Sequence, residues 1–369
     1  MPTFPKRIAV VQWQTDQLRQ LVAAILPDNP FYSRKFDEAG GPRKISTPHQ
    51  FSRDFPCTTK MELVEDQMAH PPYGTNLTFP IERFTRCHQT SGTQGVPLRW
   101  LDTAESWDWI LRNWEQVHRT AGVTANDRIY FAFSFGPFLG FWSAFEAATR
   151  LGCLCLPGGG SSSAARLRAI LDHQATVLCC TPTYALRLAE VAAEERLSLA
   201  EQPVKLIITA GEPGGCIPAT RARIEERWPG ARVCDHHGMT EVGAVTFECP
   251  ARPGVLHVIE SAYYPEVVDA TSGQAIDSGE TGELILTPLD RPGSPVLRYR
   301  TGDLVKTALD AVCECGRCDL ALEGGILGRV DDMIIVRGVK VFPSAIEEII
   351  RRVGGIAEYQ GQIHSAQAM

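Results

Sequence analysis

A chain of 369 residues is longer than one ordinary domain, so its length predicts two or three units, or one large α/β body with an appendage. Hydrophobic residues make up 44% and charged residues 21%, which is typical of a soluble globular protein with a large core. The formal net charge of −7 argues against a general nucleic-acid binder, which would present a basic face, and no basic run indicates attachment to a membrane surface.

The N-terminal region and the cysteines indicate the cellular compartment in which the protein is expected. The apolar run at 8–11 is too short for a signal-peptide core, and no segment reaches the roughly 18 apolar residues that a membrane span needs. Twelve cysteines without a secretion signal point to reduced thiols. We therefore expect a cytoplasmic protein that does not span a membrane.

The first 120 residues read as mainly helical. Helical spacing runs from about residue 15 to 38, with interruptions at Pro27 and Pro30, and a polar connection then leads to residue 87. The stretch 104–122 predicts an amphipathic helix.

From residue 128 to 241, short apolar runs alternate with helical stretches. Strands are predicted at 128–135 and 176–182. Three further stretches each begin with a strand: 153–160 ends in a turn, 204–213 ends in a Gly-Pro turn, and 231–241 runs into a loop. The predicted helices between them are 138–152, 163–174, 183–197 and 218–230. This order indicates an α/β fold with a doubly wound, mostly parallel sheet, in which ligands bind at the carboxyl ends of the strands.

The predicted pattern of secondary structure changes twice after residue 241. Strands separated by Gly, Pro and Asp turns predict a β-rich subdomain over about 243–328. A polar step at 329–332, a strand, a Gly turn and a helix from about 343 predict a small α+β domain. We therefore expect a body at 1–328 and a partial C-terminal domain at 329–369.

A loop rich in small residues, Ser91, Gly92, Thr93 and Gly95, precedes the α/β region. Small residues let the backbone approach a polyphosphate, and successive N–H groups and hydroxyls can donate to its oxygens. No Gly-Lys-Ser/Thr closes the loop, so it is not the signature of P-loop nucleotidases. The alternative is an ordinary Gly/Ser turn.

Three further motifs follow predicted strands. The pair Thr240–Glu241 could supply a phosphate hydroxyl and an oxygen ligand for Mg²⁺, unless 235–243 is only a solvated turn. Asp303 could accept hydrogen bonds from ribose hydroxyls, or could be a β-turn aspartate. The loop 209–213 could flank a planar ring.

The order of these motifs resembles that of the acyl-adenylate-forming superfamily. The stretches TSGTQGVP, AGEP, GMTE, YRTGD and GRVDDMIIVRG follow one another, and FYSRKFDEAG, LHVIE and VFPSAIEE are most similar to the phenylacetate–CoA ligases. The resemblance extends from about residue 30 to 355. It implies activation of an aromatic carboxylic acid with ATP and Mg²⁺ to an acyl-adenylate, followed by thioester formation with CoA.

The resemblance also implies a role for each matching residue. Those at the triphosphate would be Ser91, Gly92, Thr93 and Gly95. Those at the adenine would be Gly211, Glu212, Pro213, Asp235 and His236. Those at the phosphate, Mg²⁺ and the ribose would be Thr240, Glu241, Asp303 and Arg329, with Asp331 as a hinge and Lys340 at CoA.

An acyl pocket is implied as well. The aromatic, glycine-rich stretch 131–142 offers a planar ring four contacts, from Phe133, Phe135, Gly136 and Phe138. The strand-end residues His237 and Gly238 are also assigned to the substrate. The alternative is that the aromatic residues belong to the core.

The run CECGRC places thiols at the spacing of a structural zinc site. The related ligases resemble this chain in a Cys…His…Cys-x-Cys pattern, which implies four zinc ligands, Cys249, His257, Cys313 and Cys315, with Cys318 as a spare. Chance thiols are the alternative. The cysteines in apolar strands are expected to be core residues: Cys153, Cys155, Cys179, Cys180 and Cys234.

Three features depart from the family pattern. Gln94 stands where Thr is usual, and Val96 stands where Lys is usual, which removes one positive charge near the phosphates. The C-terminal region is shorter than the family's, and the lysine that the family places near its C-terminus has no counterpart.

Two other readings of function stay open. One is adenylation with transfer to a carrier-protein thiol or an amine instead of CoA. The other is a non-catalytic protein that binds nucleotide and aryl acid. The expected partners are thus a small aromatic acid and CoA or a carrier protein, without nucleic acid or membrane, and the resemblance is compatible with a homodimer.

Overall fold

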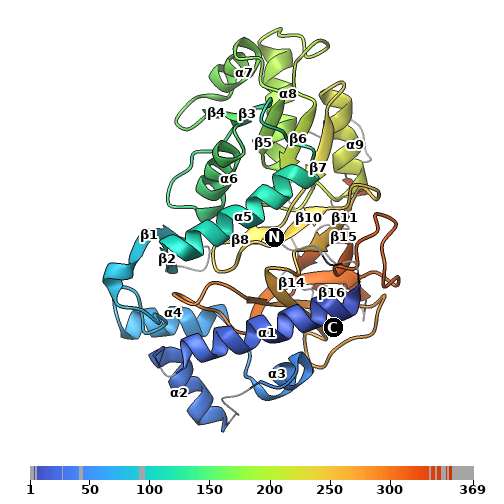
Figure 1. Cartoon of the computed structure of the whole chain (residues 1–369). Helices are drawn as coiled ribbons and strands as arrows, with labels where there is room; N and C mark the ends of the chain where they lie inside the picture. Colours follow the sequence, from blue (N-terminus) through green and yellow to red (C-terminus); the bar gives the residue numbers. More distant parts are fainter. Residues whose placement is uncertain are drawn as a thin grey trace, which may run out of the picture.

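The computed structural model describes residues 4, 6–26, 28–40, 45–90, 96–331, 334–336, 339–341, 346 and 349–350. Figure 1 shows the parallel sheet and its helices in the upper half of the molecule, and the antiparallel strands with the N-terminal helices in the lower half. Helix α5 runs along the junction between the halves in this view.

The upper half is the predicted α/β unit. Its strands are all parallel, in the order β4-β3-β5-β6-β7. They span Arg128–Phe131 (β3), Leu154–Pro157 (β4), Val177–Cys180 (β5), Leu206–Thr209 (β6) and Arg232–Asp235 (β7). The helices span Ala104–Thr120 (α5), Leu139–Arg150 (α6), Ser163–Asp172 (α7), Pro182–Glu194 (α8) and Pro218–Arg227 (α9).

Alternate side chains of each parallel strand face different helices. Ile129 and Phe131 pack in one apolar cluster with α5 and α6, whereas Tyr130 packs in a second cluster with α7, α8 and α9. Both faces of the sheet are therefore covered, which explains the nearly continuous apolar runs of these strands. The expectation of a doubly wound α/β fold is confirmed.

The N-terminal region contains more helix than the sequence predicts. Its elements are α1 (Arg7–Ile25), α2 (Pro30–Ala39), α3 (Pro48–Asp54) and α4 (Lys60–Ala69), followed by the antiparallel pair β1 (Phe84–Gln89) and β2 (Arg99–Thr103). The prediction of a polar connection to residue 87 was wrong. Threonine side chains cap the two missed helices, Thr47 before α3 and Thr59 before α4, and Glu62 completes a capping box.

The lower half is built on an antiparallel sheet. Its strand order is β10-β11-β15-β14-β13-β12. The strands span Thr246–Glu248 (β10), Val255–Val258 (β11), Tyr263–Val268 (β12), Thr281–Pro288 (β13), Tyr299–Thr307 (β14) and Ala321–Arg329 (β15). Two short pairs accompany it: β8 (Gly238–Met239) with β9 (Gly243–Ala244), and β16 (Ile334–Val336) with β17 (Val339–Val341).

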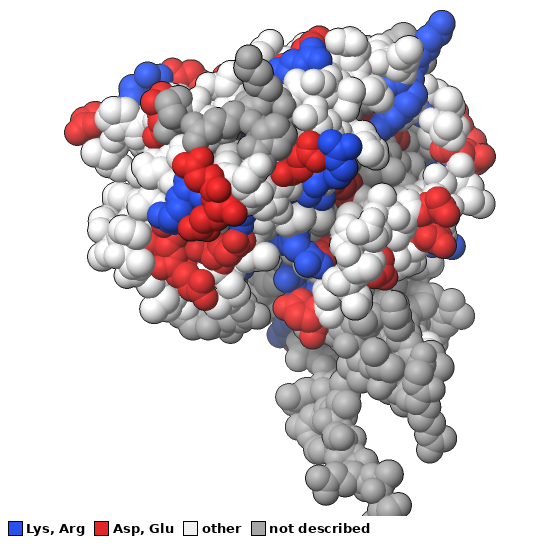
Figure 2. Space-filling model, turned by 90° about the horizontal axis from the view of Figure 1, so that it is seen from below, with Lys and Arg blue, Asp and Glu red and all other residues white. Residues whose placement is uncertain are grey.

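The surface carries charges of both signs. Figure 2 shows acidic and basic side chains interspersed over the face seen from below, with several acidic groups gathered on one side of it. This visible face thus presents no continuous basic area of the kind that nucleic acids bind. Within the described ranges, no helix combines the length and the apolar character that crossing a membrane requires.

Candidate functional site

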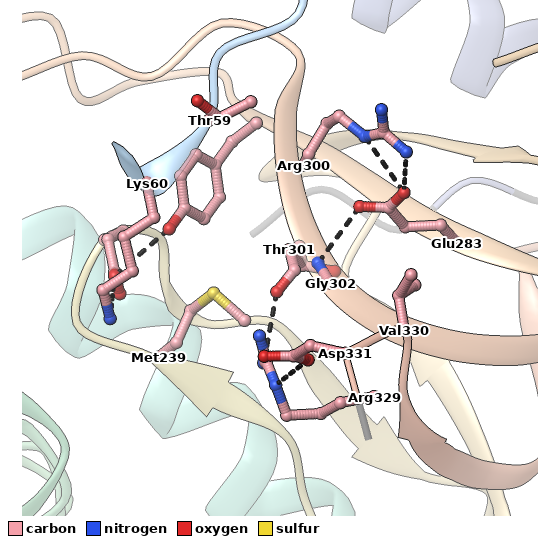
Figure 3. Close-up of a pocket in the computed structure, with 12 residues that line it drawn as sticks. Thr59, Lys60, Met239, Glu283, Arg300, Thr301, Gly302, Arg329, Val330 and Asp331 are labelled. Atoms are coloured by element: carbon pink, nitrogen blue, oxygen red, sulfur yellow. Dashed lines mark hydrogen bonds and ion pairs between the residues drawn. The ribbon is translucent and has the colours of Figure 1, made fainter. Parts of the chain in front are cut away.

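A cavity of about 930 Å³ lies at the carboxyl ends of β5, β6 and β7. Ile208, Gly211 and His236 line it from the sheet side. A second cavity of about 370 Å³ adjoins it near β14 and is drawn in Figure 3. Lining residues that the two cavities share are Thr59, Lys60, Met239, Glu241, Arg329 and Asp331. Ligands of open α/β sheets bind at such an edge.

One part of the large cavity is apolar. Its walls include Trp114 from α5, Phe133 and Phe138 from the loop before α6, and Val64 from α4. The Phe133 ring stacks on Phe141, with centroids 4.1 Å apart. Such walls suit a planar apolar group.

Two of the aromatic-stretch residues assigned to the substrate lie elsewhere. Phe135 packs against Trp142 and Phe145, with ring centroids 5.0 and 5.6 Å away, and is not among the lining residues. Gly136 adjoins it, and its carbonyl accepts a hydrogen bond of 2.8 Å from Trp142 Nε1. Phe135 is thus a core residue, which was the alternative to a substrate contact.

The loop after β6 contributes its glycine to the cavity. Gly211 lines the wall, with a φ of 93° that favours glycine. Glu212 accepts a hydrogen bond of 2.8 Å from the backbone N–H of Thr183, the second residue of α8. Glu212 and Pro213 are not lining residues.

The aspartate that ends β7 is a buried support. Asp235 Oδ1 accepts hydrogen bonds from Thr209 Oγ1 at 2.9 Å and from the His236 backbone N–H at 3.0 Å. Burial raises the pKa of this carboxyl. Gly215 is required beside it, because a Cβ there would lie 2.5 Å from Asp235 Oδ1.

The histidine after it faces the cavity and is neutral. Burial lowers the pKa of His236 to about 3, and its Nδ1 lies 3.0 Å from the Thr246 carbonyl oxygen, so Nδ1 carries the proton. Its ring lies 4.2 Å from that of Trp114. The imidazole thus presents an uncharged wall.

The predicted ribose residues lie together. Arg329 Nη1 donates to Asp303 Oδ1 at 3.2 Å and Nε donates to Asp331 Oδ1 at 3.0 Å. His237 Nε2 lies 3.1 Å from Asp303 Oδ2. His237 is therefore placed beside Asp303 and not in the apolar part, while Gly238 lines the large cavity.

Thr240 and Glu241 also line the cavity, in the loop between β8 and β9. The Tyr299 hydroxyl donates to Glu241 Oε1 at 3.2 Å. Burial, and next the adjacent Glu241, raise the Tyr299 pKa well above its usual value, so this hydroxyl stays a neutral donor.

A buried ion pair supports the loop between β8 and β9. Arg291 donates to Asp102 at 2.8 and 2.7 Å, and both side chains are almost completely buried. Arg291 Nη1 also donates to the carbonyl oxygens of Thr240 at 3.1 Å and Glu241 at 2.9 Å. The guanidinium thereby fixes the backbone that carries both predicted phosphate-site residues.

Sequence reasoning missed several residues of this site, among them Lys60, Trp114 and Arg291. The capping box of Thr59 and Glu62 was a local signal for the start of α4, but not for the place of Lys60 at the cavity. The predicted triphosphate loop 91–95 and the side chain of Lys340 lie outside the described residues.

A separate group of side chains of the kind that can hold a metal ion lies near β10, the edge strand of the antiparallel sheet, and its neighbour β11. The candidate ligand atoms of Cys249, His257, Cys313 and Cys315 all lie within 4.8 Å of one another. His257 Nδ1 lies 3.2 Å from the Asp319 carbonyl oxygen, so Nδ1 holds the proton and Nε2 can bind a metal. Cys318 Sγ instead lies 3.3 Å from the Phe4 carbonyl oxygen.

Comparison with known families assigns the class of the protein. A family model described as "AMP-binding enzyme" matches residues 89–287, which include the parallel sheet and the motifs at 209–213 and 235–243. The fold and the cavity thus belong to an AMP-binding enzyme.

Individual relatives show which family of AMP-binding enzymes the chain resembles. The phenylacetate-coenzyme A ligase of Escherichia coli (strain K12) is 34% identical over 343 residues, which are 91% of this chain and 75% of that protein. That of Pseudomonas putida is 30% identical over 356 residues, covering 95% and 77%. The chain therefore belongs to the phenylacetate–CoA ligase family of the acyl-adenylate-forming superfamily.

A solved structure agrees with the fold. The crystal structure of 2-hydroxyisobutyryl-CoA ligase in the postadenylation state, in complex with R3-HIB-AMP, superposes with a TM-score of 0.88 at 29% identity. The match covers 95% of this chain and 74% of that chain. The α/β body with its antiparallel sheet is thus an acyl-CoA ligase fold.

Proposed function

We propose that the chain joins a carboxylic acid to CoA in two steps, by way of an acyl-adenylate, and that the acid carries an aromatic or similarly apolar group. The observation that carries this proposal is the single cavity in which an apolar part, lined by Phe133 and Phe138, meets the Thr240–Glu241 loop. An apolar acid bound there would have its carboxylate beside the phosphate-site residues. Family members bearing the names of CoA ligases support the class of reaction.

In the first step, a carboxylate oxygen bonds to the α-phosphorus of ATP, and the bond from that phosphorus to pyrophosphate breaks. Such displacement depends mainly on positioning and charge neutralisation. Thr240 would donate its hydroxyl to phosphate, and Asp303 with Arg329 would hold the ribose. In the second step, the CoA thiol loses its proton, sulfur bonds to the acyl carbon, and AMP leaves.

Glu241 fits the role of a Mg²⁺ ligand. Its carboxylate is buried and both of its described contacts, from Tyr299 and Lys60, reach the same oxygen, Oε1. Oε2 is thus left for a hard cation, which would neutralise phosphate charge when bound. Arg291 holds the backbone from which this carboxylate extends, through hydrogen bonds to the Thr240 and Glu241 carbonyl oxygens.

The segment from Arg329 to Asp331 would act as the hinge between the body and the C-terminal domain. Asp331 is half exposed and is tied to Arg329 by a 3.0 Å hydrogen bond. We assign the body to residues 1–328 and the C-terminal lid to the segment from 329 onward, with Asp331 at the hinge and Lys340 on the CoA side. Cleavage by a protease at this connection, slowed by MgATP with acid, is the expected sign of such a hinge.

We also propose structural zinc at Cys249, His257, Cys313 and Cys315. The donor set is Cys₃His, which suits zinc. Burial lowers the pKa of His257, so the imidazole is neutral as metal binding requires. When bound, zinc would cross-link the end of β10 and β11 to the turn before β15.

The test of function is pyrophosphate release with ATP and Mg²⁺ over a panel of arylacetic, benzoic and short aliphatic hydroxy acids, with and without CoA. Release dependent on an aryl acid, with CoA thioester as product, is the expected result. Release that favours 2-hydroxyisobutyrate would overturn the aromatic assignment. Acylation of a supplied carrier protein with CoA inert, or ATP binding without release from any acid, would favour the two alternative readings.

A further inference from the structure

Helix α4 begins at the cavity with a lysine. Thr59 is the N-cap, and Lys60, the first helical residue, lines both the large cavity and the adjoining smaller one. A cation in the first turn of a helix is unfavourable, because this end of the helix dipole is positive. An anionic partner at the cavity would offset this cost.

One anionic partner is visible in the structure. Lys60 Nζ lies 3.3 Å from Glu241 Oε1, the oxygen that also accepts the Tyr299 hydroxyl. Figure 3 shows Lys60 reaching into the cavity from the side opposite Arg329. The Glu241 side chain is 4% exposed, whereas that of Lys60 is 44% exposed, so the ammonium is open to solvent and to a ligand while the carboxylate is enclosed.

The charges around this pair favour an anion at the lysine once a metal ion is present. Among the described lining residues of the large cavity, the cationic side chains are Lys60 and Arg329. Arg329 already contacts two carboxylates, Asp303 and Asp331. A divalent cation on Glu241 would repel the ammonium and bring phosphate oxygens to the same place.

We propose that Lys60 binds the phosphates of ATP, and that its ion pair with Glu241 is the arrangement of the site before Mg²⁺ and nucleotide bind. This inference rests on the proposed function, since it assigns Glu241 to Mg²⁺. A lysine on α4 thus supplies positive charge to a cavity whose wall at Val96 is apolar. It makes α4, an N-terminal helix, part of the nucleotide site.

The test is calorimetric binding of MgATP and of magnesium pyrophosphate, without acid, to the full 369-residue chain. Lys60→Met removes the charge, Lys60→Arg keeps it, and Lys205→Met is the matched control. Lys205 is an exposed lysine paired with the buried Asp127 at 3.0 Å and lines neither cavity. Thermal unfolding of each variant verifies that it is folded.

We expect Lys60→Met to weaken binding of both ligands by about ten- to a hundredfold, the range of a lost charge-assisted hydrogen bond. Lys60→Arg should stay within about threefold of wild type, and Lys205→Met should match it. Unchanged MgATP affinity in folded Lys60→Met, with only a raised KM for the acid, would overturn the inference. If wild type itself bound no MgATP, the proposed function would fail and this inference with it.

Should Lys60→Met prove unstable, Lys60→Gln offers a second neutral side chain of similar reach. A folded Lys60→Gln variant with the affinity of wild type would contradict the phosphate role in the same way. Loss of affinity in Lys60→Gln together with retention in Lys60→Arg would support it.

Discussion

Glu241 is the residue on which the proposed chemistry depends most directly. Its replacement by Gln keeps the shape and the Tyr299 contact but removes the negative charge that would hold Mg²⁺. We expect pyrophosphate release to fall by at least about a hundredfold, as when one group that stabilises developing charge is lost. The measurement is the release rate as a function of Mg²⁺ concentration.

A glutamate outside the cavity provides the comparison. Glu195→Gln removes an equal charge from an exposed ion pair with Arg168 and should leave the rate and its Mg²⁺ dependence unchanged. If Glu241→Gln had the rate of wild type at all Mg²⁺ concentrations, the metal role of Glu241 would be refuted.

Among individual site residues, those that lie at a strand end could be predicted from the sequence. Thr240, Glu241 and Phe133 line the cavity because Phe133 follows β3 closely and the other two follow β8. Lys60 and Arg291 could not be placed there from local patterns. Their contacts join positions 181 and 50 residues apart, Lys60 to Glu241 and Arg291 to Glu241, so only tertiary packing brings them to the site.

The loop between β8 and β9 depends on β2 through the buried Asp102–Arg291 pair. Replacing Arg291 by Met would leave Asp102 as a buried charge without its partner, which costs about 3–5 kcal/mol of unfolding free energy. We expect this loss in urea denaturation, together with slower pyrophosphate release, because the Thr240 and Glu241 carbonyls lose their donor.

A double variant separates charge burial from loop support. Arg291→Met with Asp102→Leu should recover part of the lost stability, because the unpaired charge is gone, yet release should stay slow. Equal stability of the single and double variants would contradict the account of Asp102 as a buried, unpaired charge.

The apolar side of α4 should influence which acids are accepted. Met61, Val64 and Met68 line the large cavity from this helix. Val64→Phe would fill part of that space, so we expect KM to rise several-fold for bulky aryl acids and little for small ones. MgATP affinity should not change, and an equal rise in KM for all acids would contradict a role of α4 in size selection.

Across the whole molecule, the parallel sheet was predictable and the pairing of the antiparallel sheet was not. Strands such as β5 (Val177–Cys180) are buried on both faces and alternate with amphipathic helices, a pattern visible in local sequence. In the second sheet, β11 lies directly beside β15, although β12, β13 and β14 come between them in the sequence. Local patterns contain no information on such long-range partners.

The proposed zinc would stabilise the molecule where this long-range pairing occurs. We expect elemental analysis to find about one zinc per chain, and Cys249→Ser to lower the unfolding free energy by several kcal/mol, because it removes one ligand of a cross-link. Cys87→Ser, an exposed cysteine on β1, is the control and should retain zinc and stability. A folded wild-type chain purified without zinc and indifferent to added zinc would refute the site.

The stability of the whole chain should also depend on two histidines that are neutral and buried. Burial lowers the pKa of His118 to about 4 and that of His236 to about 3, whereas both titrate near pH 6.5 in the unfolded chain. Because the folded pKa values are depressed, the stabilising contribution is complete above pH 6.5 and is lost as pH falls towards 4. Well inside those limits each histidine lowers the unfolding free energy by about 1.4 kcal/mol for each pH unit of acidification, and near the limits by about half as much.

Buried carboxyls such as Asp235 and Glu260 act in the opposite direction, because burial raises their pKa values and they take up protons in the folded state. The histidine contribution is therefore measured as a difference between variants. His118→Gln should be less stable than wild type at pH 7 but should lose about 1 kcal/mol less between pH 6.5 and 5.5 in urea denaturation. Parallel losses in the two proteins would mean that His118 takes up its proton without unfolding, and that its burial does not make the fold sensitive to acid.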